Sequence, residues 1–406
     1  MADQRKKWLD KPAVVIDHGA TRCVVGMGGE SHPRAMVPTV VGRPMESVAM
    51  RIPDLKSFYI GSEAELKGNK ILNLRRPLYH GMVDNWDDMA KIWEHIFSKH
   101  LRVNPEEHPM LLTEAPLVPI INREKMCQVP SPSYSISKAI TRLNFGGRDL
   151  TDYLAKSLAS KCGEKCVRRQ SRYGSASGDA KSGVWEVVAR KIKENYCYVS
   201  SDYNQEVARM NAELRGLPSS LGKNITQTYE LPDGQVVNID FERFKVPESL
   251  FQPELIGQPD SPALHQAVPL SIEKLQSQEM PGLKSSAPAM QLDLDLIQLQ
   301  KTLYENIYLS GGNCRFPGLA ERLRMEIYKH ANKTTGLSMS VNVKDIPENG
   351  GYSSSAVPSA WVGGSILSSL SSFQDMWISR QEYEEIGPSI VHQKCVQATP
   401  DGEYGS

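Results

Sequence analysis

The sequence predicts an α/β fold, because short apolar segments with strand character alternate with segments of helical periodicity. Two of the apolar segments, at 13–17 and 307–310, run directly into turns that contain glycine. Such junctions suit phosphate binding, since glycine lets backbone N–H groups approach an anion closely. The chain has 406 residues, enough for two or three domains, and 40% are hydrophobic, which argues against a wholly disordered protein.

The composition argues against several other classes of protein. Basic and acidic residues both number 47, so the net charge gives no reason to expect binding to nucleic acid. The seven cysteines are irregularly spaced, which favours free thiols in a reducing compartment over a disulfide framework. The first ten residues are charged and lack a secretory core, and no apolar run is long enough to cross a bilayer. We therefore expect a soluble, intracellular protein with no membrane insertion.

The first elements expected along the chain are a hairpin, a helix and a buried strand. The apolar segments Ala13–Asp17 and Val24–Met27 flank a glycine-containing turn and are predicted to pair. Asn85 is placed to cap a helix over Trp86–Phe97. The mostly apolar segment Pro109–Thr113 is predicted to be a buried strand. The apolar face of the helix is expected to comprise Trp86, Met89, Trp93 and Ile96.

Two helices separated by a polar loop are expected next. One helix is predicted over Arg148–Leu158 and the other over Glu186–Tyr196, both from their apolar spacing. The segment Ser160–Gly183 between them is rich in glycine, serine, lysine and arginine, and it is expected to be a loop. The inward face of the first helix is expected to comprise Leu150, Tyr153, Leu154 and Leu158.

The remaining elements complete the alternation of strands and helices. Thr228–Leu231 and Gln235–Ile239 flank a Pro-Asp-Gly turn and are predicted to form a hairpin. Asp260–Pro288 is rich in proline, serine and glutamine, and it is expected to be an irregular surface insertion. The last elements expected are helices over Leu292–Tyr304 and Pro317–Tyr328, a strand at Ile307–Ser310, and ordered segments at Ala356–Leu370 and Phe373–Glu385.

Three short motifs are candidates for nucleotide binding, and each has a structural alternative. Asp17, followed by Gly19 and Thr21, can hold a hydrated Mg²⁺ and phosphates, or can simply form a hairpin turn. Gly311 and Gly312 follow a strand and can support a purine or a phosphate, or can form a plain loop. Lysine and glutamate at 193–194 can cover a base and bond a ribose hydroxyl, or can lie on a solvated helix face.

Other catalytic and metal-binding patterns are missing from the sequence. Cys162 and Cys166 are spaced like half of a zinc site, but no second Cys or His pair lies near them. The nine histidines show no metalloprotease spacing, and no serine lies in a G-x-S-x-G elbow. Neither a zinc enzyme nor a serine hydrolase is therefore expected.

With these motifs in hand, the chain resembles actin and the actin-related proteins over most of its length. The resemblance implies two similar α/β halves with ATP and a divalent cation in the cleft between them. A sugar kinase of the same superfamily is disfavoured, since those enzymes lack strings such as LLTEAP and WISRQEY. The strings that carry the resemblance include PTVVGRP, HGMVDNWDDM, EEHPMLLTEAP, GRDLTDY, LPDGQV, RFKVPESLFQP, LSGG, WVGGSILS and GPSIVHQKC.

The resemblance also implies a division of the chain and roles for particular residues. The first half would comprise 1–128 and 359–396 with a small subdomain at 39–76, the second half 129–358 with a small subdomain at 161–284, and a mobile tail 397–406. Carried over by position, Asp17 would lie near Mg²⁺ through water, with Gly19 and Thr21 at the phosphates. The adenosine would lie between Lys193 and Glu194 on one side and Gly311, Gly312, Asn313 and Phe316 on the other.

Further residues correspond to other functional positions of actins. His80 matches a histidine that actins often methylate, or is an unmodified buried histidine. Ile366, Leu367 and Leu370 match the helix that lines the partner-binding cleft in actins, or pack in the core. The expected partners are therefore actin or actin-binding proteins, with self-association as a further possibility and no direct contact with nucleic acid.

Departures from the family pattern bear on activity. Ala20 stands in place of a phosphate-binding serine, Val24 in place of a phosphate-contacting lysine, and Arg315 in place of a methionine at the adenine side. Between Gln128 and Tyr134 the chain lacks the segment in which actins keep the second phosphate loop and the helix that orients the attacking water. Two prolines in Val129–Ser133 exclude that helix.

These departures predict a divergent actin-like cytoskeletal protein that acts through protein–protein contacts. It would bind ATP with Mg²⁺ weakly and hydrolyse it little or not at all, because hydrolysis requires an oriented water and charge stabilisation at the transferring phosphoryl group. One alternative is a filament-forming actin ATPase, which the altered segment Met45–Ser57 disfavours, since actins insert that loop into the next subunit. Another is a nuclear actin-related subunit of a chromatin complex. The expected location is accordingly the cytoplasm and cytoskeleton, with the nucleus as the alternative.

Overall fold

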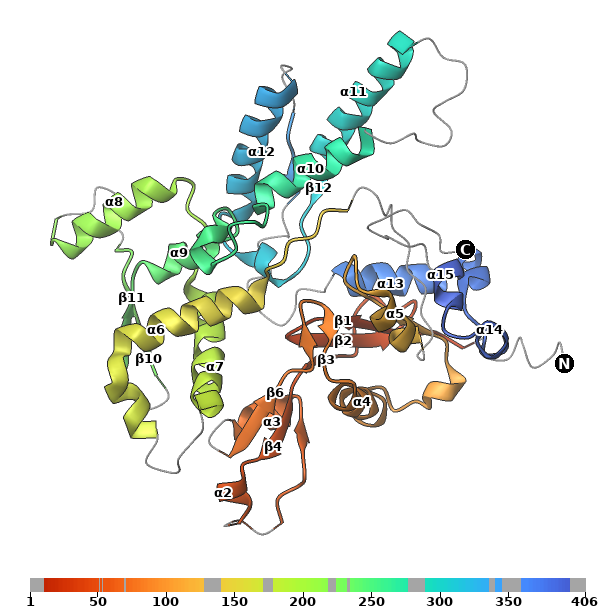
Figure 1. Ribbon diagram of the computed structural model, residues 1–406, viewed down its shortest axis with the longest axis horizontal. Helices are drawn as coiled ribbons and strands as arrows, with labels where there is room; N and C mark the ends of the chain where they lie inside the picture. Colours follow the sequence, from red (N-terminus) through yellow and green to blue (C-terminus); the bar gives the residue numbers. More distant parts are fainter. Residues whose placement is uncertain are drawn as a thin grey trace. The chain divides into compact units, whose positions relative to one another are not determined.

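The computed structural model describes residues 11–50, 52, 54–68, 71–127, 140–170, 178–217, 224–231, 234–276, 289–335, 340–344 and 359–394 (Figure 1). The chain divides into two compact units. Unit 1 comprises Met1–Ile140 with Val357–Ser406, and unit 2 comprises Thr141–Ala356. Within the described parts of both units, no helix has the length and apolar character needed to span a bilayer.

The main sheet of unit 1 has the strand order β3-β2-β1-β9. Strands β1 (Val14–His18) and β2 (Arg22–Met27) pair antiparallel, which confirms the predicted hairpin. β3 (Ala35–Pro38) pairs antiparallel with β2, and β9 (Met110–Leu112) pairs parallel with β1. All three residues of β9 are buried, as predicted for this strand. The carboxyl ends of β1 and β9 therefore lie at the same edge of the sheet.

Helices cover both faces of this sheet (Figure 1). On one face lies α4 (Trp86–His95), which continues as a π-helical turn over Ile96–Leu101. The Asn85 side chain accepts a hydrogen bond from the backbone N–H of Asp88, which confirms the predicted cap. On the other face lies α13 (Ser359–Ser369). The predicted apolar face of α4 packs in the core through Trp86, Met89, Trp93 and Ile96.

The contact between α13 and the sheet depends on Trp361, which is fully buried. Its indole Nε1 donates to the carbonyl oxygen of Val15 at 3.0 Å. The indole lies so near β2 that a Cβ on Gly26 would come within 2.5 Å of it, so this position requires glycine. A segment from the far end of the chain thus completes the core of unit 1.

A smaller sheet in unit 1 has the order β5-β4-β6. Arg43 on β4 reaches the carboxylate of Asp88, which is fully buried at the start of α4. This ion pair joins the small sheet to the main body of the unit. The elements of this region are β4 (Val41–Pro44), α2 (Glu46–Ala49), β5 (Tyr59–Ile60), α3 (Ser62–Lys67), β6 (Leu72–Arg75), β7 (Leu78–Tyr79) and β8 (Met82–Val83).

The rest of unit 1 consists of short helices. A complete capping box begins α14, where Ser379 and Glu382 each bond the other's backbone N–H. Glu382 also pairs with Lys394 at 2.7 Å. The helices are η2 (Pro105–Glu107), α5 (Ile120–Cys127), η7 (Ser371–Met376), α14 (Arg380–Ile386) and α15 (Ile390–Lys394).

Unit 2 is built around one large apolar cluster to which most of its elements contribute. Leu150, Leu154 and Leu158 of α6 are fully buried in it, as the helical spacing predicts. The elements are α6 (Gly147–Gln170), α7 (Gly178–Tyr196), α8 (Tyr203–Leu214), β10 (Gln227–Glu230), β11 (Val236–Ile239), α9 (Glu242–Glu248), η5 (Pro253–Ile256), α10 (Leu264–Gln276), α11 (Ala289–Glu305), β12 (Ile307–Tyr308), η6 (Gly312–Arg315), α12 (Leu319–Thr335) and β13 (Val343–Lys344).

Sheets in the described part of unit 2 are small. β10 and β11 form the predicted hairpin, although Pro232 and Asp233 of its turn lie outside the described residues. β12 pairs only with β13 among the described residues, in parallel and over two residues each. The segment Val129–Ser133, where the sequence is expected to be shortened, lies outside the described residues. The predicted mobile tail 397–406 also lies outside them.

Two loop predictions in unit 2 are wrong where the structure describes them. Within Ser160–Gly183, α6 continues to Gln170 and α7 begins at Gly178, because lysine, glutamate and arginine are good helix formers despite their polarity. Within Asp260–Pro288, α10 forms because its apolar residues pack on the core, which outweighs the presence of Pro269. Residues 171–177 and 277–288 of these segments, and the side chains of Cys162 and Cys166, are not described.

Candidate functional site

The first group of candidate residues lies at the turn between β1 and β2. Asp17 is half-buried, and its carboxylate accepts a hydrogen bond of 2.6 Å from the Thr113 hydroxyl. Burial raises the pKa of Asp17 above its ordinary value, and the bond from Thr113 opposes that rise. A carboxylate with this desolvation penalty gains from a nearby cation. Thr113 follows β9, so parallel pairing with β1 brings the two side chains together.

The turn itself is held by backbone and hydroxyl contacts. The backbone N–H of Gly19 donates to the Arg22 carbonyl at 3.1 Å, and a Cβ at Gly19 would lie 2.5 Å from that oxygen. The Thr39 hydroxyl donates to the Gly19 carbonyl at 2.8 Å, and the Thr39 N–H donates to the Thr21 carbonyl. Glycine is therefore required at position 19 by close approach of the main chain. These main-chain and hydroxyl contacts hold the conformation of the turn.

His18, next to Asp17, is a neutral structural side chain. Its Nε2 accepts from the Trp93 indole N–H at 2.8 Å, and its Nδ1 lies 3.4 Å from the Thr113 carbonyl. Burial lowers the pKa of His18 to about 4, while the backbone contact with Thr113 opposes the change. The ring therefore adds no positive charge to this turn at neutral pH.

Val24 has a role that bears directly on phosphate binding. It lies in β2 opposite Asp17, and its side chain is buried at 6% exposure. It packs in the apolar cluster with Val15, Leu111 and Trp361. The position at which the resemblance places a phosphate-contacting lysine therefore supplies no charge to the turn.

The second group of candidate residues lies in unit 2, around Gly147 at the start of α6. Lys193 on α7 is buried, and its Nζ donates to the Gly147 carbonyl at 2.5 Å. A Cβ on Gly147 would lie 2.8 Å from Asn313 Oδ1 and 3.2 Å from Lys193 Nζ. Glycine at position 147 thus lets both polar groups approach the main chain closely. The alternative of a solvated face for Lys193 is excluded by its burial.

The titration of Lys193 is strongly altered by its position. Burial lowers its pKa to about 8, and the negative charge of Glu194 opposes the change. Glu194 itself is half-buried. An ammonium group with a lowered pKa favours the approach of an anion, because an anion would offset the cost of burying the charge.

The glycine turn of unit 2 follows β12. Gly311 has a φ of +96°, a conformation that residues with a side chain rarely adopt, and it precedes the short helix η6. Gly311 and Gly312 are exposed, and Asn313 is half-buried. Phe316 is 2% exposed and packs in the core of unit 2, with its N–H donating to the Asn313 carbonyl. The Phe316 ring therefore anchors this turn to the core.

The residues near α13 are divided between surface and core. Ile366 and Leu370 are 57% and 45% exposed, whereas Leu367 packs against the cluster around Trp361. Leu367 thus packs in the core of unit 1, whereas Ile366 and Leu370 are open to solvent. His80, between β7 and β8, is half-buried with a φ of +48°, and its ring lies edge-on to Tyr79 at 4.0 Å.

Sequence reasoning found Asp17, Gly19 and Lys193 but missed the groups that position them. Thr113 and Thr39 orient the first turn, and Gly147 accepts the lysine bond. A signal for Thr113 was present, because a hydroxyl residue ends a strand that could pair in parallel beside β1. No cluster of three or more metal-ligating side chains occurs among the described residues. Asp17 alone fits a Mg²⁺ held through water and phosphate oxygens, which is a common arrangement for this ion.

Comparison with protein families gives a match over nearly the whole chain. The family model for Actin matches residues 9–130 and 131–396. The match is divided between residues 130 and 131, a point inside Val129–Ser133.

Proposed function

The chain belongs to the actin family and has an actin-like α/β fold, and on that premise we propose that it is a divergent cytoskeletal protein acting through protein–protein contacts. In this proposal it binds ATP with Mg²⁺ weakly and hydrolyses it little or not at all. Asp17 would hold the hydrated cation, and Gly19 and Thr21 would contact the phosphates. Lys193 and Glu194 would contact the adenosine on one side, and the turn Gly311–Phe316 would support it on the other.

The burial of Val24 is the observation that carries the proposal of weak binding. A lysine at this position would contribute a charge-assisted hydrogen bond to a phosphate, and a valine packed against Trp361 contributes none. Because His18 is neutral, it does not replace the missing charge. Lys193 is retained, so one half of the nucleotide site is better preserved than the other.

The shortened segment supports the proposal of low hydrolysis. The family match is divided at 130 and 131, where the resemblance places the second phosphate loop and the water-orienting helix. A bound ATP without those groups has neither an oriented water nor full stabilisation of the transferring phosphoryl group. A bound ATP would therefore be hydrolysed little or not at all.

Exposed apolar residues at the end of α13 support a role in protein contacts. Ile366 lies on α13, Leu370 directly follows its last residue, and both are exposed. Leu367, between them in the sequence, packs inward. An amphipathic helix from an actin-binding protein, actin itself or a second copy would cover these side chains. In this proposal the protein would act in the cytoplasmic cytoskeleton, and a place in a nuclear complex is the alternative.

Two further features belong to the same proposal. The chain would divide into halves at 1–128 with 359–396 and at 129–358, with small subdomains at 39–76 and 161–284. His80 would be methylated, since its half-buried ring lies in a short turn with Tyr79 against it. Mass spectrometry of the protein from its native source would detect a 14 Da addition to the peptide, and an unmodified peptide would contradict the assignment.

A thermal melt with and without excess Mg-ATP tests nucleotide binding. At about a hundred times its dissociation constant, a ligand specific to the folded state adds roughly 2.7 kcal/mol, which raises the midpoint by several degrees. We expect this shift to be lost in Lys193→Met. It should persist in Lys329→Met, a matched control whose lysine side chain is 67% exposed. Equal shifts in both variants would contradict the assigned site.

Phosphate release and light scattering separate the proposal from a filament-forming ATPase. The expected result is ATP-dependent stabilisation without turnover above background and without cooperative assembly. Sustained phosphate release together with cooperative assembly would overturn the proposal in favour of that alternative. For protein contacts, Ile366→Asp should weaken the binding of an actin-binding amphipathic helix by about tenfold. Ile121→Asp, at a residue that is also exposed, serves as the control.

A further inference from the structure

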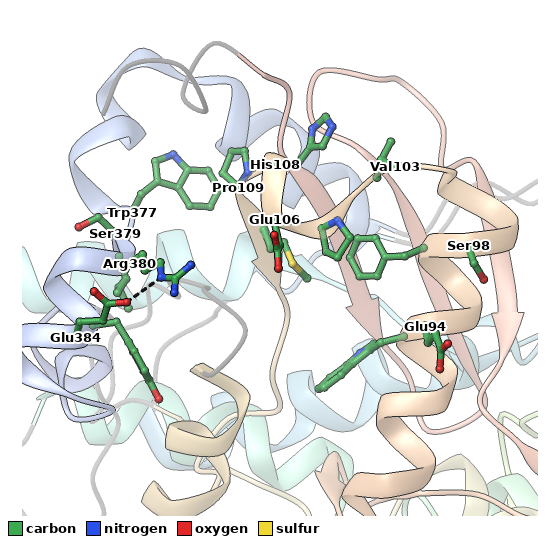
Figure 2. Close-up of a pocket in the computed structure, with 16 residues that line it drawn as sticks. Glu94, Ser98, Val103, Glu106, His108, Pro109, Trp377, Ser379, Arg380 and Glu384 are labelled. Atoms are coloured by element: carbon green, nitrogen blue, oxygen red, sulfur yellow. Dashed lines mark hydrogen bonds and ion pairs between the residues drawn. The ribbon is translucent and has the colours of Figure 1, made fainter. Parts of the chain in front are cut away.

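Unit 1 contains an apolar pocket of about 940 Å³ that none of the candidate nucleotide residues lines. One wall is formed by α4 and the π-helical turn after it, through Trp93 and Phe97. The other wall is formed by the C-terminal segment, through Trp377 and Tyr383. Figure 2 shows the two walls on either side of the segment that carries Glu106 and Pro109. A pocket of this size and aromatic content is suited to a large apolar side chain.

The rim of the pocket is mainly acidic. Glu94, Glu106 and Glu384 line it, and all three are exposed. Arg380 is the basic residue among those lining it, and it pairs with Glu384 at 2.8 Å (Figure 2). The carboxylates of Glu94 and Glu106 are not part of that ion pair. The pocket therefore favours a ligand that combines an aromatic group with positive charge.

The first described residues of the chain, beginning at Lys11, lie beside this rim. Lys11 pairs with Glu107, and the carbonyl of Pro12 lies 2.9 Å from Nδ1 of His108, which lines the pocket. The ion pair is exposed and adds little stability by itself, so its importance is that it places the chain beside the pocket. Asp10 precedes Lys11, and before Asp10 lie residues 5–9. This segment, RKKWL, combines three positive charges with the indole of Trp8.

We propose that this pocket binds residues 5–9 of the same chain, with the indole of Trp8 between the aromatic walls and the basic side chains facing the acidic rim. Three residues of extended chain span roughly 10 Å, which is enough to carry Trp8 from Lys11 into a pocket at whose rim Lys11 is held.

Tethering explains why the segment of the same chain is the preferred occupant. A segment joined by so short a linker is present at an effective concentration in the millimolar range, so it outcompetes free ligands of similar affinity. A partner with a stronger basic and aromatic motif would displace it. The pocket is then a docking site of unit 1 that residues 5–9 cover until such a partner displaces them.

Peptide binding by the full chain tests the proposal. The probe is a fluorescein-labelled peptide with the sequence of residues 4–10, QRKKWLD. We expect Trp8→Ser protein to bind it at least about tenfold more tightly than wild type, because the tethered segment no longer competes. A probe with serine in place of tryptophan should not bind. Equal binding by both proteins, or binding by neither, would overturn the proposal.

Two further tests concern the charge of the rim and whether the docked segment comes from the same chain or from a second copy. In the Trp8→Ser background, Glu106→Lys should weaken peptide binding severalfold, whereas Glu254→Lys, at an exposed glutamate outside the pocket, should not. An unchanged affinity in Glu106→Lys would contradict this site.

In wild type, the fluorine resonance of 5-fluorotryptophan at Trp8 should differ from that of the free peptide and stay constant on dilution. A resonance that moves on dilution would show that a second copy supplies the segment, and a free-peptide shift would show no docking.

Discussion

Lys193 offers a quantitative test of the candidate site in unit 2, because burying its charge lowers the stability of the folded protein. The side chain is buried, burial lowers its pKa to about 8, and its Nζ bonds the Gly147 carbonyl. In the nucleotide-free protein, the folded state therefore holds a proton less readily than the unfolded state. The substitution Lys193→Met removes the titrating group and keeps a side chain of similar length.

The expected size follows from the two pKa values. A fall from 10.5 to about 8 corresponds to a penalty of about 3 kcal/mol at neutral pH, where the lysine is charged in both states. Loss of the bond from a charged donor to the Gly147 carbonyl removes about 2 kcal/mol. The variant should then be more stable than wild type by about 1 kcal/mol at pH 7.

The pH dependence is the sharper part of the prediction. Between about pH 8 and 10.5 the unfolded lysine stays protonated while the folded lysine loses its proton, so the free energy of unfolding rises with pH. Between pH 7 and 9.5 the wild type should gain about 2 kcal/mol relative to Lys193→Met. Other titrating groups are common to both proteins and cancel in this difference.

Urea unfolding of nucleotide-free protein at the two pH values measures this difference. Lys329→Met is the control, and it should follow the wild type because its lysine is exposed. If wild type and Lys193→Met keep the same stability difference at pH 7 and 9.5, the lysine is not desolvated as described. Destabilisation of the variant by several kcal/mol at both pH values would show that the bond to Gly147 dominates.

Three further predictions concern stability. Leu154→Ala should lower the free energy of unfolding by about 2–5 kcal/mol, since the side chain is fully buried in the core of unit 2; calorimetry should show that Leu214→Ala, at an exposed leucine, has little effect. Arg43→Met should destabilise by about 1–3 kcal/mol in chemical denaturation, because it leaves the buried Asp88 carboxylate unpaired, and Arg43→Lys should recover part of the loss. The pKa of Glu382 is lowered to about 2, because hydrogen bonds from Lys394 and Ser379 outweigh the effect of burial. The ionised Glu382 should therefore stabilise the folded protein above pH 4.5, and this stabilisation should be lost as the pH falls towards 2. At 36% exposure that stabilisation is about 1 kcal/mol, and Glu382→Gln should abolish it in melts at pH 7 but match wild type near pH 2.

The sequence predicted elements best where local signals and tertiary packing agree. The hairpin β1–β2, the capped helix α4 and the buried face of α6 all combine regular spacing with a clear start or turn. The helix α10 was missed because its composition suggests a loop, and only packing on the core of unit 2 stabilises it. Tertiary context there outweighed local composition.

The candidate site was predictable in its residue types but not in its energetics. The strand-end carboxylate Asp17 and the glycine turn at Gly311 are visible as local patterns. The burial of Lys193 and the inward packing of Val24 are not, because each depends on a neighbour distant in sequence, Gly147 for the lysine and Trp361 for the valine. A single sequence gives no direct signal of such contacts.

The bond from Trp361 to Val15 has a consequence for how the protein folds during synthesis. The two residues are 346 positions apart, and this indole fills the space between α13 and the main sheet. Unit 2 is continuous in sequence and can complete its core while the chain is still being made. The sheet of unit 1 must wait with one apolar face uncovered until α13 leaves the ribosome. Chaperones that shield apolar strands should therefore associate with nascent chains from which α13 has not yet left the ribosome, and should dissociate once it has.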